Sequence, residues 1–373
     1  MSFIDQVIND RDNLNLTEDL TIDELHTIIK SMEPNKSPGI DGIPVEFYQI
    51  FWDIIKLELF ELIQYLLSAN TLSETQRKAI IVLIEKGEDL NFLSSWRPIS
   101  LLCVDTKIIA KCIAFRLKDV IEKCISKNQF CSPAKSIIEC NNIMRDTLYY
   151  ANNNNIQGAV INVDWCRAFD SIDHDLLFKI MRKMGFCSAF INWIKLLYNG
   201  AMSSCIVNGF LTRSFNIGRG VRQGCPLSML LFVIFQEPLY RVIERSNVIR
   251  PIILPCNTRK ALGYADDTSF IISDDRSIVE CFTILGRFEN ASGIKLNKQK
   301  TKLLGFGAWK DRQLWPVDGI TILHGSITIL GIQYNNNYNN AILLSWTKIV
   351  ETIKSKVNLL TIRKFNIYQS NTY

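Results

Sequence analysis

Apolar and polar positions along this chain form two kinds of pattern, short strand-like runs and longer stretches with helical spacing. Runs of strand length and strand composition occupy residues 79–86, 159–169, 262–272 and 327–334. Apolar residues recur with helical spacing in residues 105–124, 137–151, 175–184, 229–245, 277–292 and 341–367. These patterns predict short strands interspersed with longer helices along the chain.

The segment KALGYADDTSFIIS (260–273) places two adjacent carboxylates, Asp266 and Asp267, between two strand-like runs. This pattern predicts a β-hairpin with acids at its tip. Two like charges in an apolar hairpin are costly unless a cation neutralises them, and hard divalent cations prefer carboxylate oxygens. A solvated acidic turn is the alternative, because acids are ordinary turn residues.

A third carboxylate, Asp164, follows the apolar run in AVINVDWCRAF (159–169). Its separation from Asp266 along the chain is too long for a local turn but ordinary for neighbouring strands of one sheet. Phosphoryl transfer by two metal ions needs cations about 3.5–4 Å apart, held by carboxylates that converge from different strands. Asp164, Asp266 and Asp267 supply the residue types for such a site.

Two cations and a glycine-rich loop suit a phosphate-bearing ligand. Lys86 ends one strand-like run and Arg97 lies near the start of the next, WRPISLL, so the pair predicts a triphosphate clamp. Cations on a solvated face are the alternative. The segment GRGVRQGCPLS (218–228) combines glycines with a proline at an expected helix start, where exposed amides suit a phosphate or sugar.

Composition narrows the class of protein. The chain has 373 residues, 47% of them hydrophobic, and a formal net charge of +5, which is compatible with a nucleic-acid partner. Eleven cysteines with no C-x-x-C pair, and only three histidines, argue against a disulfide framework and a structural zinc site. We therefore expect a reducing compartment, nucleus or cytoplasm, with no signal peptide and no membrane segment.

Five segments occur in an order that resembles a known protein family. They are WRPISLL, VDWCRAFDSIDH, GVRQGCPLS, GYADD and SGIKLNKQKTK, and SPGIDGIPVEFYQIFW points the same way. Together they resemble the reverse transcriptases of non-LTR, LINE-type retrotransposons over about residues 34 to 335. A bacterial or organellar intron-type reverse transcriptase shares YADD but matches WRPISLL joined to GVRQGCPLS less well.

The resemblance implies an α/β (α+β) right-hand polymerase with fingers, an antiparallel-sheet palm and a partial thumb. The implied divisions are residues 1–66 as an N-terminal extension and start of the fingers, 67–335 as the reverse transcriptase domain with fingers and palm, and 336–373 as a truncated start of the thumb.

The resemblance also implies a role for each candidate site residue. Asp164 corresponds to the first metal ligand, and Asp266 and Asp267 to the pair on the palm hairpin. The implied cofactor is two Mg²⁺ ions, with Mn²⁺ as a substitute. The implied nucleotide-binding residues are Lys86 and Arg97 on the triphosphate, Phe169 under the sugar, Gln223 on the nucleotide and Lys300 behind the palm. A core aromatic is the alternative for Phe169, and a solvated lysine for Lys300.

The function implied is RNA-directed DNA polymerase, a nucleotidyltransferase that extends a DNA primer with dNTPs on an RNA template. Element RNA in a ribonucleoprotein is a further implied partner. The alternative is a degenerate or domesticated fragment that binds RNA without polymerising. The truncated thumb favours that alternative, because the grip on primer and template is spread across that surface. The chain also departs from the family pattern: QFCSPAKSI (129–137) lacks the family's Gly-Arg, which bears on the template-proximal loop, and Met229 replaces a proline. Neither an endonuclease domain nor a Cys/His-rich segment flanks the expected domain, so the chain resembles a piece of a longer polyprotein.

Overall fold

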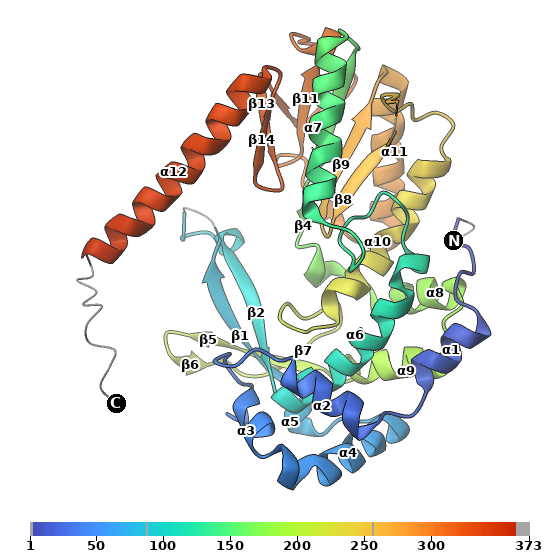
Figure 1. Cartoon of the computed structure of the whole chain (residues 1–373), viewed down its shortest axis with the longest axis vertical. Helices are drawn as coiled ribbons and strands as arrows, with labels where there is room; N and C mark the ends of the chain where they lie inside the picture. The colour runs from blue at the N-terminus through green and yellow to red at the C-terminus, as the bar shows by residue number, and fades with distance from the viewer. Residues whose placement is uncertain (1–2, 87–88, 256, 363–373) are drawn as a thin grey trace. The chain divides into compact units, whose positions relative to one another are not determined.

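The computed structural model describes residues 3–86, 89–255 and 257–362, which Figure 1 colours from blue to red along the chain. These residues form two compact units. Unit 1 comprises the described residues within Met1–Ser136, Trp165–Asn247 and Cys281–Asn297. Unit 2 comprises those within Ile137–Asp164, Val248–Glu280 and Lys298–Tyr373. Helix α11 (Asp275–Ser292) begins in unit 2 and ends in unit 1.

Unit 2 is built on a five-stranded sheet with the order β12-β11-β3-β9-β8. Its strands are β3 (Gly158–Val163), β8 (Ala261–Tyr264), β9 (Asp267–Ile272), β11 (Lys302–Phe306) and β12 (Thr321–Leu323). The four strands β11, β3, β9 and β8 pair antiparallel, and only β12 joins its neighbour in parallel. The expected antiparallel sheet beneath the acids is therefore present.

The central strands of this sheet are buried on both faces. Consecutive residues Val160 and Ile161 point to opposite faces, and both are fully buried, as are Phe270 and Ile271 opposite them. Helix α7 (Ile137–Asn153) covers one face, where it packs against β8, β11 and the short helix η3 (Gly307–Trp309). Burial on both faces explains why these segments are continuous apolar runs in the sequence.

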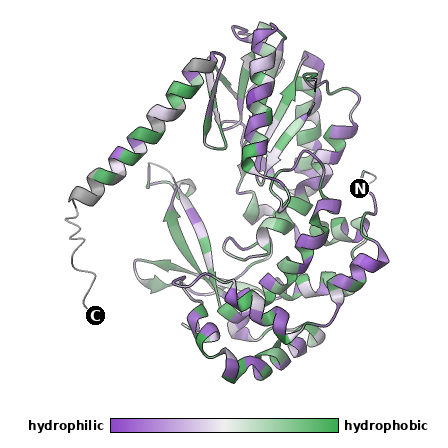
Figure 2. Cartoon of the chain, viewed as in Figure 1, coloured by the Kyte–Doolittle hydropathy of each residue, from purple (hydrophilic) through white to green (hydrophobic). Residues whose placement is uncertain are grey.

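The C-terminal part of unit 2 is a hairpin followed by a long helix. Strands β13 (Ser326–Ile329) and β14 (Ile332–Asn335) pair antiparallel across Leu330 and Gly331, whose φ angles of 49° and 80° are both left-handed. The prediction of one strand over 327–334 was wrong, because these two residues turn the chain. Helix α12 (Tyr338–Ile362) packs against β14 and carries many apolar residues in Figure 2. It replaces the expected helix 341–367, of which residues 363–367 lie outside the described part.

Unit 1 contains a mixed sheet surrounded by helices. The strands run in the order β2-β1-β5-β6, with β7 paired to β5, and β1 lies parallel to β5. These strands are β1 (Lys78–Glu85), β2 (Trp96–Leu102), β5 (Met202–Val207), β6 (Phe210–Leu211) and β7 (Phe215–Asn216). The helices of this unit are α1 (Asp10–Thr17), α2 (Ile22–Lys30), α3 (Val45–Ile50), α4 (Trp52–Ala69), α5 (Glu74–Arg77), α6 (Val104–Cys124), α8 (His174–Met184), α9 (Ser188–Leu196) and α10 (Ser228–Arg245), with short elements η1 (Leu93–Ser95), η2 (Phe169–Ser171), β4 (Trp165–Cys166) and β10 (Lys295–Leu296).

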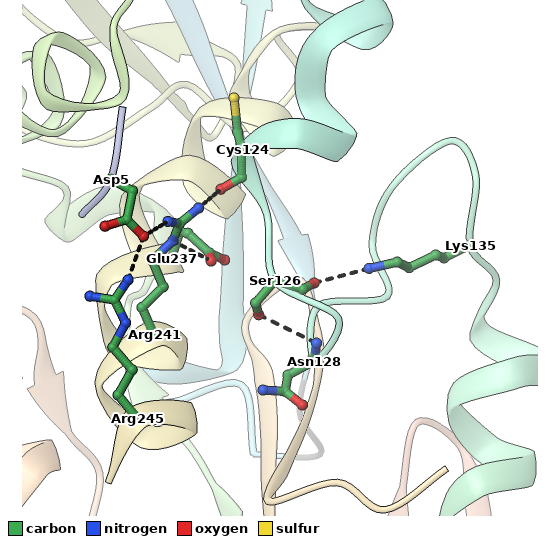
Figure 3. A network of polar contacts seen from close by, with 8 residues as sticks. All are labelled: Asp5, Cys124, Ser126, Asn128, Lys135, Glu237, Arg241 and Arg245. Atoms are coloured by element: carbon green, nitrogen blue, oxygen red, sulfur yellow. Dashed lines mark hydrogen bonds and ion pairs between the residues drawn. The ribbon is translucent and has the colours of Figure 1, made fainter. Parts of the chain in front are cut away.

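Helix α10 is fixed in unit 1 by a partly buried ionic network, shown in Figure 3. Glu237 is fully buried and accepts a hydrogen bond from Arg241 Nε at 2.9 Å. Arg241 also donates to the Cys124 carbonyl at the end of α6 and pairs with Asp5. Burial raises the pKa of Glu237 to about 7, although the Arg241 guanidinium acts in the opposite direction. The network thus ties α10 to α6 and to the N-terminal segment.

No helix in the described part of the chain is both long and apolar enough to cross a membrane. The domain boundaries at 66/67 and 335/336 stay a prediction, and residues 363–373 of the expected thumb lie outside the described part.

Candidate active site

The two adjacent acids lie at the tight turn between β8 and β9. Tyr264 pairs with Asp267, so only Ala265 and Asp266 connect the strands. Ala265 has a φ of 54°, a left-handed conformation that side chains other than glycine adopt at a cost. Both acids are exposed, whereas Ala265 is buried. The predicted hairpin with acids at its tip is confirmed.

Asp164 reaches the same edge from the neighbouring strand. β3 pairs antiparallel with β9, and its last residue, Val163, lies opposite Thr268. Continuing this register by one residue places Asp164 opposite Asp267. Opposed residues in an antiparallel pair have Cα atoms about 4.5–5.5 Å apart and side chains on the same face. The backbone therefore brings the three predicted acids to one edge of the unit 2 sheet.

Buried neighbours hold these positions in place. The Asp164 amide donates to Thr301 Oγ1 at 3.3 Å, and Thr301 is fully buried. Cys140 on α7 interacts electrostatically with Asp267. Burial raises the pKa of the Cys140 thiol to about 12, and the negative charge of Asp267 adds to this rise. Thr301 and Cys140 have no motif that would single them out, and only the fold brings them to the acids.

The acid-bearing edge suits divalent cations by its donor chemistry. Carboxylate oxygens are the ligands that Mg²⁺ and Mn²⁺ prefer, and three of them at one sheet edge repel one another unless a cation is present. The residues present therefore fit a metal site.

A set of side chains of the types that ligate metals lies in unit 1. The ligand atoms of Asp41, Cys103 and Asp105 all lie within 4.8 Å of one another. The protein itself supplies partners to this set. Asp105 accepts from Gln76 Nε2 at 2.7 Å, and Cys103 Sγ donates to the Thr75 carbonyl at 3.7 Å. Burial raises the pKa of the Cys103 thiol to about 11. A protonated thiol and bonded carboxylates explain this set without a metal.

Lys86 and Arg97 lie together on the β1–β2 hairpin of unit 1. Ile84 pairs with Arg97, and Lys86 follows Ile84 by two residues, so Lys86 and Arg97 emerge on the same face as diagonal neighbours. The Lys86 amide donates to the Ser95 carbonyl at 2.7 Å, which extends the ladder past the strand end. Both side chains are exposed. The two cations are thus available to one anionic ligand.

Gln223 lies in a loop that crosses β2. Its carbonyl accepts from the Ser100 amide at 2.7 Å, and its Nε2 donates to Asp170 Oδ1 at 3.3 Å. Burial raises the pKa of Asp170 despite this hydrogen bond. Close approach of neighbouring backbone requires glycine at two of the three glycine positions in this loop, 220 and 224. A Cβ on Gly220 would lie 2.7 Å from the Asp170 backbone, and one on Gly224 would lie 2.7 Å from the Ser100 carbonyl oxygen.

Phe169 is half-buried and stacks on Phe232 of α10, with ring centroids 4.6 Å apart. The expectation that Phe169 ends the Asp164 strand was wrong. Arg167, with a left-handed φ of 49°, turns the chain, and Phe169 begins η2. Its carbonyl accepts from the Val221 amide at 2.8 Å, so Phe169 and the Gln223 loop are linked within unit 1.

Lys300 is exposed and belongs to unit 2, next to the Asp164 partner Thr301.

Arg222 has a role that its sequence pattern did not reveal. It is buried and donates through Nη2 to the Arg77 carbonyl at 2.6 Å and to the Met202 carbonyl at 3.3 Å. Burial lowers its pKa. Arg222 therefore holds the Gln223 loop against the end of α5 and the start of β5.

Comparisons with known proteins identify relatives of this chain. Residues 84–334 match the family model described as reverse transcriptase (RNA-dependent DNA polymerase). The transposon TX1 uncharacterized 149 kDa protein of Xenopus laevis is 32% identical over 82% of this chain and 23% of its own length. The Pol polyprotein of the type-1 retrotransposable element R2 of Popillia japonica is 24% identical over 77% of this chain and 39% of its own length.

Two further similarities complete the comparison. The Pol polyprotein of the type-2 retrotransposable element R2DM of Drosophila melanogaster is 26% identical over 73% of this chain and 25% of its own length. The chain thus spans about a quarter to two fifths of these curated relatives. A solved structure of telomerase from Candida albicans aligns with 77% of this chain and 48% of its own, at a TM-score of 0.46 and 14% identity.

Proposed function

Because this chain belongs to the reverse transcriptase (RNA-dependent DNA polymerase) family, we propose that it is an RNA-directed DNA polymerase that extends a primer with dNTPs. The expected origin in a non-LTR retrotransposon and the α/β right-hand fold class are confirmed by the family match and by the named transposon relatives.

One observation carries the proposal. β3 ends at Val163 opposite Thr268 of β9, so Asp164 follows at the same end of the paired strands as Asp266 and Asp267, which supports a common site. These three residues come from two separate sequence motifs, and the fold brings them to one exposed edge. An RNA-binding fragment without polymerase activity gains nothing from three carboxylates at a surface meant for phosphates, because like charges repel. The non-polymerising alternative is therefore not favoured.

In this proposal Asp164, Asp266 and Asp267 hold two Mg²⁺ ions, with Mn²⁺ as a substitute. Two ions held by these carboxylates would supply Lewis-acid chemistry for the attacking primer 3′ oxygen and for the pyrophosphate leaving group. Two features fix the backbone that carries these acids: the two-residue turn of Ala265 and Asp266, and the hydrogen bond from the Asp164 amide to Thr301.

Other residues of the chain bind the nucleotide. Lys86 and Arg97, on one face of their hairpin, bind the triphosphate. Phe169, fixed by its stacking on Phe232, lies under the sugar and excludes a 2′-hydroxyl. Gln223, tied to β2 through its carbonyl, contacts the nucleotide, and Lys300 lies behind the metal-binding edge.

The proposed partners are an RNA template, a DNA primer and dNTPs, with element RNA in a ribonucleoprotein. The excess of basic residues, a formal charge of +5, favours such partners. The proposed locations are the nucleus and the cytoplasm, since eleven cysteines without a disulfide pattern favour a reducing compartment.

Primer extension tests the proposal. The purified chain is assayed on poly(rA)/oligo(dT) with dTTP and Mg²⁺, and we expect extension that stops when EDTA removes the metal. Asp164→Asn keeps the shape of the side chain and removes its charge, so we expect extension to be lost. Asp311→Asn, an exposed acid of the same unit, is the matched control and should extend normally. No extension by the intact chain, or full extension by Asp164→Asn, would contradict the proposal.

A further inference from the structure

A cavity of about 310 Å³ lies within unit 2, between α7, β14 and the start of α12. Figure 1 shows β14 between these two helices, and the Tyr334 hydroxyl of β14 donates to Asn141 Oδ1 of α7 at 2.8 Å. None of the proposed metal-binding or nucleotide-binding residues lines the cavity. Its volume falls at the lower end of the range for small-molecule sites, about 300–1,000 Å³.

Side-chain amides dominate the polar lining of this cavity, and several lack partners. Figure 2 shows hydrophilic residues along the visible face of α7. The side chains of Asn142 and Gln333 make no hydrogen bond to any residue that the structure describes. Asn336 donates through Nδ2 to the Gly305 carbonyl at 3.1 Å, but its buried Oδ1 has no partner among the described residues. Buried acceptors are nearly always bonded in folded proteins, so this oxygen favours a polar ligand.

Two aromatic rings flank the amides. Tyr149 on α7 and Trp346 on α12 line the cavity with 51% and 61% of their surface exposed. No lining residue is acidic. The one arginine in the lining, Arg145, pairs with Asp146 through Nε at 2.9 Å. The lining therefore disfavours a cation and suits a flat, polar, neutral or anionic group.

We propose that this cavity binds a single unpaired nucleobase. Stacking on exposed aromatic side chains, with hydrogen bonds to the base edge, is how proteins bind unstacked bases. An amide both donates and accepts, so Asn142, Gln333 and Asn336 match the mixed edge of a base such as adenine. Tyr149 and Trp346 supply the stacking surfaces. The base comes either from a free mononucleotide or from an unpaired position of an RNA strand, and the second source rests on the proposed function.

Equilibrium binding without Mg²⁺ and dNTPs tests the proposal, with adenosine monophosphate and a hexa-adenylate RNA as the two probes. Loss of stacking in Tyr149→Ala or Trp346→Ala should weaken binding about tenfold or more. Tyr149→Phe and Trp346→Phe keep a ring and should bind within about twofold of the unaltered chain. Tyr65→Ala, an exposed tyrosine on α4, is the matched control and should bind normally.

A second variant guards against loss of folding. Gln333→Glu preserves shape but replaces an amide with a carboxylate in an acid-free cavity, so it should bind both probes about tenfold more weakly. Weakening with both probes supports a mononucleotide site, and weakening with the RNA alone supports a base within a strand. Binding of neither probe, or unchanged affinities in all three variants, would overturn the proposal. Asp266→Asn should bind adenosine monophosphate normally, because Asp266 does not line the cavity. Nucleotide binding is therefore measured independently of primer extension, and the two proposals can fail separately.

Discussion

Two antiparallel hairpins in this chain carry opposite charges in opposite surroundings. The β8–β9 hairpin of unit 2 carries Asp266 and Asp267, turns in two residues, and is buried along β9 up to the acid itself. The β1–β2 hairpin of unit 1 carries Lys86 and Arg97 and is exposed at the end that bears them. Residues 86–95 connect its paired strands, far more than the two that connect β8 to β9.

The difference reflects what each ligand demands. Metal ligands must be placed to within a few tenths of an ångström, and a carboxylate is short, so its backbone must be fixed. Buried strands and a tight turn fix it. Lysine and arginine have long side chains that reach a triphosphate from many backbone positions. An exposed hairpin is sufficient for them.

The largest effect should come from the acidic hairpin. Asp266→Asn removes one charge from the metal-binding edge while preserving the shape of the side chain. The transition state should lose several kcal/mol of metal-assisted stabilisation, so kcat should fall about 10³-fold or more. Since Asp266 is exposed, the melting temperature should change little. Primer extension and thermal melting measure the two quantities. Full activity in this variant would show that β8–β9 is an ordinary acidic turn.

Core truncation tests the contrast in burial directly. Ile271 on β9 is 1% exposed, so Ile271→Ala should reduce the free energy of unfolding by about 2–5 kcal/mol. Ile84 on β1 is 51% exposed, and Ile84→Ala should cost less than about 1 kcal/mol. Denaturant unfolding of both variants checks this. Equal losses would mean that the two hairpins are supported equally.

The basic hairpin should affect nucleotide affinity. Arg97→Ala removes a two-pronged contact with the triphosphate and should raise the KM for dTTP about tenfold, with primer-template affinity within about twofold because many cations share duplex binding. Lys78→Ala, at the other end of β1 and paired with Glu74, is the matched control. Weaker duplex binding with unchanged dTTP kinetics would rule out the triphosphate clamp.

Sugar selection should depend on neither hairpin. Phe169→Val replaces the ring that stacks on Phe232 with a smaller aliphatic side chain, which opens space for a 2′-hydroxyl. We expect the ratio of kcat/KM for UTP to that for dTTP to rise about tenfold. The melting temperature is measured alongside. A lowered melting temperature with an unchanged ratio would identify Phe169 as an ordinary packing residue.

The smallest effect concerns the turn itself. Ala265 has a φ of 54°, which glycine adopts without strain, so Ala265→Gly should raise the free energy of unfolding by about 0.5 kcal/mol. Ala261 is buried within the same hairpin, in β8, and Ala261→Gly should lower it by about 1 kcal/mol. Destabilisation by both variants would show that the left-handed conformation at Ala265 carries no strain.

The sequence predicted features whose cause is local. The acidic hairpin is encoded by two short apolar runs on either side of two acids, and burial on both faces explains the apolar run that became β3. The ordered motifs also predicted the family. Where a local feature was misread, one or two left-handed residues were responsible. Leu330 and Arg167 adopt left-handed φ angles, which leucine and arginine rarely do, so the residue types did not predict these turns. As a result, one expected strand is a hairpin, and Phe169 lies outside the strand that leads to Asp164.

Only the tertiary structure decided which distant residues meet. The register that pairs Val163 with Thr268, one residue before Asp164 and one after Asp267, follows from pairing β3 with β9, and no spacing in the sequence specifies it. Thr301 supports Asp164, and Arg222 holds the Gln223 loop, through hydrogen bonds to partners distant in the sequence. The cavity between α7, β14 and α12 is likewise invisible in the sequence, because its lining comes from segments more than 150 residues apart that meet only when the chain folds.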